Sequence, residues 1–156
     1  MLAQIDEVCA RLPQARKGLA LLGHRPNHDV ATVLRIAQAG LTEQIEAHGI
    51  YACASQKEEF GVALLEAMAT GLAVIAPNSG GPATFVEEGT TGFLADTTSI
   101  ESVRTALRRA LASRNDEPRA RRTSNTVRST YTIEAMAESL ASVYADVGRE
   151  SDQVAA

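Results

Sequence analysis

Four short apolar runs, separated by segments with a helical pattern, constrain the fold of this chain more than any other feature. Each run is apolar almost throughout and is bounded by residues such as Gly, Ser or Pro, which is typical of a strand buried on both faces. The runs lie at residues 19–23, 49–55, 72–77 and 92–96. Strands that alternate with helices form a parallel sheet covered on both sides, so the sequence predicts the α/β, doubly wound class.

The helices are predicted from apolar residues spaced three and four apart. This pattern indicates helices at 2–12, 29–40, 61–70, 100–111 and 131–148. Asp29 is a possible N-cap, Gly40 a possible stop, and Thr98 with Glu101 a capping box. Pro82 suits the first position of a further short helix. The charged stretch 114–131 is expected to be a solvated helix or loop.

Composition excludes several classes of protein. With 156 residues, 45% of them hydrophobic, the chain fits one domain, which we expect at 1–149, with a disordered tail at 150–156. Because no apolar run reaches the roughly 18 residues of a membrane span, and no secretory signal is evident, we expect a cytoplasmic protein. The net charge of −4 argues against nucleic acid or an anionic membrane as a partner. Cys9 and Cys53 lie too far apart in sequence to suggest a disulfide framework or a zinc site.

Two turns from a strand into a helix carry the polar chemistry, because ligands in such folds bind beyond the carboxyl ends of the strands. In the first turn, Gly61 precedes a helix whose N–H groups at Gly61, Val62 and Ala63 could bind a phosphate. In the second turn, Gly80 and Gly81 leave backbone N–H groups open to an anion or a sugar oxygen, although Gly-Gly before Pro is also ordinary turn chemistry.

A pair of carboxylates accompanies the first turn. Glu58 lies just before the helix and Glu66 lies on it, about one and a half turns or roughly 8 Å along the axis from its start. Carboxylates accept hydrogen bonds but do not donate them, so they suit the hydroxyl groups of a hexose or a ribose. One carboxylate on each side of a phosphate-binding helix end matches the order of groups in a nucleotide diphosphate sugar.

The stretch 52–96, ACASQKEEFGVALLEAMATGLAVIAPNSGGPATFVEEGTTGFLAD, resembles the nucleotide-sugar half of retaining glycosyltransferases of the GT-B fold. That group includes sucrose-phosphate synthases and bacterial polysaccharide transferases. The matching motifs are two glutamates separated by seven residues around Phe-Gly, then EAMA, GG-P and GTTGFL. A looser similarity extends from residue 19 through the last predicted helix.

The resemblance implies a Rossmann-like domain that binds the donor of a hexose transfer with retention of configuration, without a metal or other cofactor. By this resemblance Glu58 contacts the donor hexose and Glu66 the ribose. The backbone of Gly61, Val62 and Ala63 contacts the diphosphate, and the sugar site also includes Phe60, Gly80 and Gly81. No catalytic side chain is assigned.

The chain also departs from the family pattern. We expect no acceptor domain within these 156 residues, the Arg and Lys that usually neutralise the pyrophosphate have no match, and the segment between Gly40 and Gly49 is short. Thr84 stands where many relatives carry an acid, and His48 is expected to be structural.

These departures leave an alternative open, which is a non-catalytic nucleotide-sugar-binding module or a truncated remnant. A GT-B-like sugar epimerase fits the motifs less well. A nucleotide sugar is the expected ligand of both the transferase and the binding module. We also expect either a separately encoded acceptor domain or self-association, through the edge of the first strand or the apolar stripe from Ile133 to Val147.

Overall fold

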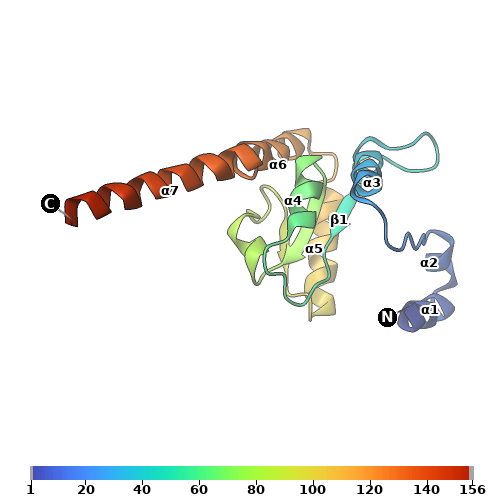
Figure 1. Cartoon of the computed structure of the whole chain (residues 1–156). Helices are drawn as coiled ribbons and strands as arrows, with labels where there is room; N and C mark the ends of the chain where they lie inside the picture. The colour runs from blue at the N-terminus through green and yellow to red at the C-terminus, as the bar shows by residue number, and fades with distance from the viewer. Residues whose placement is uncertain (1, 155–156) are drawn as a thin grey trace. The chain divides into compact units, whose positions relative to one another are not determined.

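The computed structural model describes residues 2–154, and their contacts define two compact units, Met1–Val30 and Ala31–Ala156 (Figure 1). The first unit contains helix α1 (Leu2–Arg11) and helix α2 (Pro13–Lys17). α1 confirms the helix predicted over 2–12. A hydrogen bond from Nη1 of Arg16 to Oδ1 of Asp6, 3.0 Å long, ties residues near the end of α2 to α1.

The first predicted strand is wrong. Residues 19–23 form no strand, and the side chains of Leu19, Leu21 and Leu22 are each about half exposed. A run of apolar residues becomes a strand only when a neighbouring strand takes up its backbone N–H and C=O groups. No ladder partner is described for this run, so its composition alone does not make it a strand.

Helix α3 (Asn27–Ala39) begins two residues earlier than predicted. Asp29 therefore lies in the first turn of the helix, where a carboxylate interacts favourably with the positive end of the dipole, and is not the N-cap. The predicted stop is confirmed, since Gly40 follows the helix with a φ of 81°. A side chain is disfavoured in that left-handed conformation.

A parallel sheet of three strands lies at the centre of the second unit. Its strands are β1 (Ile50–Ala52), β2 (Ala73–Pro77) and β3 (Phe93–Ala95), in the order β1-β2-β3. Ile75 is the central position of the register, paired with Ala52 on one side and Phe93 on the other. The predicted class is confirmed, with three strands in the described residues in place of the four expected.

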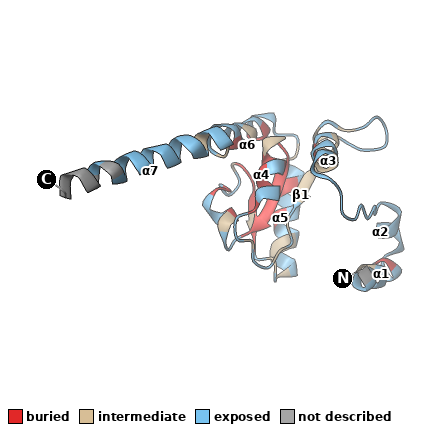
Figure 2. Cartoon of the chain, viewed as in Figure 1, coloured by how far each residue is buried: buried red, intermediate tan, exposed pale blue. Residues whose placement is uncertain are grey.

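Helices cover the sheet and complete the core. α4 (Val62–Ala69) contacts β2, and α5 (Ile100–Ala112) contacts both β2 and β3. The core cluster on this layer consists of Ile75, Phe93, Ala95, Ala106 and Ala110. Figure 2 shows buried residues on the strands and on the covering helices. Burial of such side chains is the main stabilising contribution, at about 25 cal/mol per Å² of apolar area removed from water.

The start of α5 differs from the predicted capping box. Ser99 is the N-cap, and its Oγ accepts a hydrogen bond from the N–H of Ser102 at 3.3 Å. The hydroxyl of Thr98 instead donates to Oδ1 of Asp96 at 2.6 Å. This bond and a second one from the N–H of Thr98 hold the pKa of Asp96 below its ordinary value. Thr98 is thus already engaged in the turn before the helix.

The charged stretch 114–131 contains helix α6 (Glu117–Thr130), which lies against α4. Its inner face is buried, and the hydroxyl of Ser124 donates to the carbonyl of Ala69 at 2.8 Å. The expectation of a solvated segment is therefore wrong for this face. Arg119 is only 1% exposed, and its Nε and Nη1 have no hydrogen-bond partner among the described residues. Burial lowers the pKa of Arg119.

Helix α7 (Ile133–Val154) follows α6 and confirms the helix predicted over 131–148. The predicted tail, 150–156, overlaps the end of this helix, and its last two residues lie outside the described residues. No helix within residues 2–154 combines the length and the apolar character needed to cross a membrane.

We predict that Arg119→Met stabilises the chain. Methionine fills a similar space, and the substitution removes a buried cation with unsatisfied N–H groups, at the loss of one 3.4 Å hydrogen bond from Nη2 to the carbonyl of Ser113. The free energy of unfolding in urea should rise by about 1 to 3 kcal/mol. Arg121→Met, at an exposed position of the same helix, is the control and should change the free energy of unfolding by less than about 0.5 kcal/mol. A fall in stability for Arg119→Met alone would show that the buried cation stabilises the helix.

Candidate functional site

The N-terminus of α4 is an open set of hydrogen-bond donors. Its N-cap is Gly61, with a φ of 97° and no capping side chain. The first N–H groups to find a partner in the helix are those of Leu64 and Leu65, which both donate to the carbonyl of Gly61. The N–H groups of Gly61, Val62 and Ala63 have no acceptor among the described residues. The positive end of the helix dipole is thus available to an anion.

The two predicted turns are locked together by their backbones. The N–H of Gly81 donates to the carbonyl of Glu58 at 3.0 Å, and Glu58 and Gly80 form an isolated parallel bridge. A Cβ added to Gly80 would overlap the carbonyl oxygen of Glu58, and one added to Gly81 would lie 2.5 Å from Cα of Phe60. Contacts this short exclude a side chain, so both glycines permit a close approach of two backbones.

The lock corrects one expectation about the second turn. The sequence predicts that the N–H of Gly81 is open to a ligand, but this N–H donates to the carbonyl of Glu58. The short helix that follows, η1 (Gly81–Thr84), is of the 3-10 type and has Pro82 as its second residue, one position later than predicted. The hydroxyl of Thr84 donates to the carbonyl of Gly81 at 2.7 Å and closes this turn.

The two carboxylates differ in environment. Glu58 is half-buried, and the thiol of Cys53 donates to its Oε2 across 3.8 Å and to Oγ of Ser55 across 3.4 Å. Glu66 is exposed on α4. The carboxylate before the helix is therefore oriented by its neighbours, whereas the one on the helix is positioned by the helix itself.

Tyr51 of β1 is a neighbour of this site that the motifs in the sequence did not single out. Burial is the main cause that raises the pKa of its phenol, and interactions with Cys53, Glu58 and Glu66 add to the effect. At neutral pH the phenol therefore stays protonated and can donate a hydrogen bond. The signal available in the sequence was its position near the carboxyl end of a strand that leads into the first turn.

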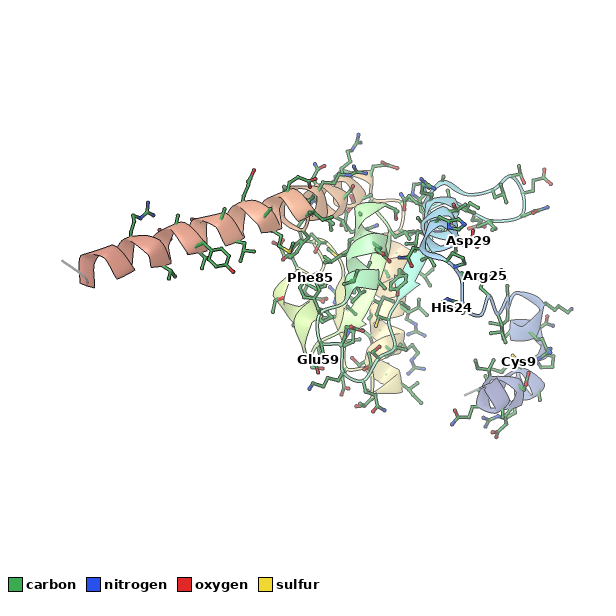
Figure 3. The ribbon with its side chains drawn as sticks, in the orientation of Figure 1. Cys9, His24, Arg25, Asp29, Glu59 and Phe85 are labelled. Atoms are coloured by element: carbon green, nitrogen blue, oxygen red, sulfur yellow. The ribbon has the colours of Figure 1, made fainter. Side chains whose placement is uncertain are left out.

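Three of the six aromatic residues gather beside the N-terminus of α4. The ring of Phe85 lies 6.1 Å from that of Phe60 and 5.8 Å from that of Tyr131, measured between centroids. Tilted and edge-on pairs at such distances are favourable. Figure 3 labels Phe85 after η1 and Glu59 in the turn before α4. The aromatic packing supports Phe60, the residue immediately before Gly61.

A groove of about 610 Å³ lies between α4, the end of α6 and the start of α7. Its lining is mostly apolar, and Glu66 contributes the carboxylate. Phe60 and Val62 also line it, whereas Glu58, Gly80 and Gly81 do not. The groove therefore adjoins one side of the helix end, and of the two locked turns only Phe60 reaches it.

The predicted site residues thus converge on one end of α4. Those of the two turns, Glu58, Phe60, Gly80 and Gly81, meet through the backbone lock, and the remaining residues lie on the first turns of the helix. The basic side chain of the same turn, Lys57, is engaged with Oε1 of Glu59 at 2.8 Å. Together these groups offer N–H donors for an anion and carboxylate acceptors for hydroxyl groups.

His48 does not belong to this end of α4. Its side-chain Nε2 lies 4.0 Å from Oε1 of Glu117 at the start of α6. Its backbone N–H donates a hydrogen bond to the carbonyl of Gln38. Its backbone φ of 60° places it at a turn. Among the described residues, no three His, Cys, Asp or Glu side chains cluster as a metal site would require.

Two solved structures share the fold of this chain. Sucrose-phosphate synthase from Thermosynechococcus elongatus aligns with a TM-score of 0.74 over 95% of this chain, at 21% sequence identity. HepE from Anabaena, determined in complex with UDP, aligns with a TM-score of 0.65 over 90% of this chain, also at 21% identity. The likeness confirms the Rossmann-like fold of a GT-B C-terminal domain.

The chain spans about a third of the length of each structure, 34% of the first and 36% of the second. No curated protein matches the sequence. The sequence pattern of the family described as glycosyl transferases group 1 matches residues 14–130, which is most of the chain. The chain therefore belongs to the family of glycosyl transferases group 1.

Proposed function

We propose that this chain is the donor-binding domain of a glycosyltransferase that transfers a hexose from a nucleotide diphosphate sugar with retention of configuration. The observation that carries the proposal is the uncapped N-terminus of α4, with Glu58 before it and Glu66 on it. Membership of the family and the UDP bound in the HepE structure support a nucleotide sugar as the ligand.

In this proposal each group meets the part of the donor that its chemistry suits. The N–H groups of Gly61, Val62 and Ala63 bind the diphosphate, because an anion is favoured at a helix N-terminus. Glu66 accepts hydrogen bonds from the ribose hydroxyls, and Glu58 accepts them from the hexose. The sugar side of the site is shaped by Phe60, Gly80 and Gly81.

No side chain is assigned as a nucleophile or as a general acid or base, and we expect no metal or other cofactor. The chemistry of this chain is then limited to holding the donor and to stabilising the diphosphate that leaves when the bond to the sugar breaks. Backbone donors aimed at a developing negative charge act in that way.

The second candidate function is a non-catalytic module that binds a nucleotide sugar. It is favoured by the small number of cations at this end of α4, because Lys57 is the one basic residue of the turn 55–61 and lies 2.8 Å from Oε1 of Glu59. The two candidates share the ligand and differ in turnover. Release of the sugar from a bound donor, with an acceptor domain of the same family supplied, distinguishes them.

We predict that the chain binds a nucleoside diphosphate with a dissociation constant between micromolar and millimolar. Backbone donors and carboxylates are present, but Lys57, the cation of the first turn, is already paired, and one charge-assisted contact contributes about 1.5 to 3 kcal/mol. In an NMR titration the amide signals near Gly61 and Gly81 should shift. Shifts confined to the arginines around Arg121 would contradict the proposed site.

We predict that Glu66→Gln and Glu58→Gln separate the two carboxylates by ligand. Glu66→Gln should weaken the binding of UDP by about tenfold and leave the binding of inorganic pyrophosphate unchanged, because it replaces one charged acceptor of the ribose hydroxyls with an NH2 donor. Glu58→Gln should leave the binding of UDP unchanged and weaken only the binding of the sugar-bearing donor. Glu43→Gln, at an exposed position outside the site, is the matched control for calorimetric titration. Equal losses for all ligands would mean that the assigned roles are wrong.

We predict that Gly81→Ala damages the site through the backbone. Its Cβ would lie 2.5 Å from Cα of Phe60, so the turn that carries Glu58 must move. The free energy of unfolding should fall by more than about 1 kcal/mol, and binding of a sugar donor should weaken more than binding of pyrophosphate. Gly18→Ala, where nothing lies within 4 Å of the added Cβ, is the control. Unchanged stability and binding in Gly81→Ala would contradict the lock.

A further inference from the structure

The two locked turns, residues 55–61 and 78–85, contain a single cation, which is Lys57. Its Nζ lies 2.8 Å from Oε1 of Glu59, and both side chains are largely exposed. Among the described residues of the second unit, no Lys, Arg or His side chain lies within ion-pair distance of Glu58. The charge of Glu58 is therefore not balanced by a cation at contact distance.

Neutral groups hold the carboxylate of Glu58 in place. The thiol of Cys53, just after β1, donates to its Oε2 across 3.8 Å, and the same thiol lies 3.4 Å from Oγ of Ser55. A thiol that donates a hydrogen bond orients a carboxylate without removing its charge. Glu58 is half-buried, and charges interact more strongly where water is partly excluded. The negative charge of Glu58 thus has a fixed position and is only partly screened by solvent.

The backbone lock takes up one donor that an anionic sugar would need. The N–H of Gly81 donates to the carbonyl of Glu58 at 3.0 Å. The N–H groups at the start of α4, those of Gly61, Val62 and Ala63, are the donors that the proposed function gives to the diphosphate. A first anion is therefore met by donors at the helix end, whereas a second anion, carried by the sugar, is met by a carboxylate.

The phenol of Tyr51 reflects the negative field of this site. Burial is the first cause that raises its pKa, and interactions with Cys53, Glu58 and Glu66 raise the pKa further. A raised pKa means that the surroundings disfavour a negative charge on the phenol. A negative charge that a ligand brings to the same place meets the same two carboxylates.

We propose that the donor of this chain carries an uncharged sugar, and that Glu58 excludes sugars with a carboxylate of their own, such as hexuronates. This inference rests on the proposed function, because it takes Glu58 as the group that meets the sugar. The hydroxyls of an uncharged sugar donate to Glu58, whereas a second carboxylate offers acceptors only. A hexose ring is shorter than the Debye length of about 8 Å at physiological salt, so a carboxylate on any of its carbons stays within range of Glu58.

Calorimetric titration of the full chain with UDP, UDP-glucose, UDP-xylose and UDP-glucuronate tests the exclusion. UDP-glucuronate carries a carboxylate at C6 of the sugar. UDP-xylose lacks C6 altogether, so it controls for the loss of the C6 hydroxyl without adding a charge. We expect UDP-glucuronate to bind at least about tenfold more weakly than UDP-xylose, because its carboxylate and Glu58 repel each other. UDP alone measures the binding of the nucleotide part.

Three variants assign the effect to the charge of Glu58, and circular dichroism verifies that each of them is folded. Glu58→Gln removes the charge, so it should weaken the binding of UDP-xylose and reduce its advantage over UDP-glucuronate to less than about threefold. Glu58→Asp keeps the charge, so the advantage should remain at about tenfold. Glu43→Gln, at an exposed position outside the site, should bind all four ligands as the wild-type chain does.

If the wild-type chain binds UDP but does not distinguish UDP-xylose from UDP-glucuronate, the inference is overturned and the proposed function stands. This comparison needs no variant, so it holds even if a substitution at Glu58 prevents folding. A difference that survives Glu58→Gln also overturns the inference, since another group then rejects the carboxylate. If none of the four ligands binds, the proposed function fails, and the inference fails with it.

Discussion

The contact between the backbone of Gly80 and Gly81 and the backbone of Glu58 to Phe60 is the constraint on which the candidate site depends. It joins the turn after β1 to the turn after β2 without the help of side chains, through one hydrogen bond of 3.0 Å and a separation that excludes a Cβ. Because a carbonyl oxygen and a Cα cannot rotate away as a flexible side chain can, the position of Glu58 follows from the position of the sheet.

The other half of the site depends on α4, and α4 is held from behind by α6. Gly71, at the end of the α4 segment, has a φ of 85° and lies so close to Ala120 that an added Cβ would be 3.2 Å from its carbonyl oxygen. Ser124 adds a hydrogen bond to the carbonyl of Ala69. The buried cation of Arg119 is the weak point of this support, since a polar group without partners in the interior destabilises the helix that carries it.

The sequence predicts those parts of the fold and of the site that depend on residues close to one another along the chain. α4 is recognised from its apolar spacing and its flanking glycines, and a motif places Glu58 and Glu66 at fixed intervals around its start. The run at 19–23 is misread because a strand is a property of a ladder, which no single run of residues contains. Arg119 is misread because a stretch rich in charge hides one buried face, and Tyr51 is missed because its tie to the site depends on burial. Spacing along the chain thus predicts the groups that point at a ligand better than the groups that surround them.

A net charge of −4 is compatible with an anionic ligand only if the attraction is short-ranged. The field of distant carboxylates is screened within about 8 Å at physiological salt, whereas the N–H groups at the start of α4 act at hydrogen-bond distance. The two carboxylates of the site would repel a phosphate placed between them, so their separation along α4 matters as much as their presence. The first turn of α4 contains no acidic residue and Glu66 lies beyond it, but Glu58 is close to the helix end, since its Cγ would lie 3.4 Å from a Cβ at Gly61. A diphosphate bound to the N–H groups there, as we propose, would therefore meet Glu58 as the nearer of the two carboxylates.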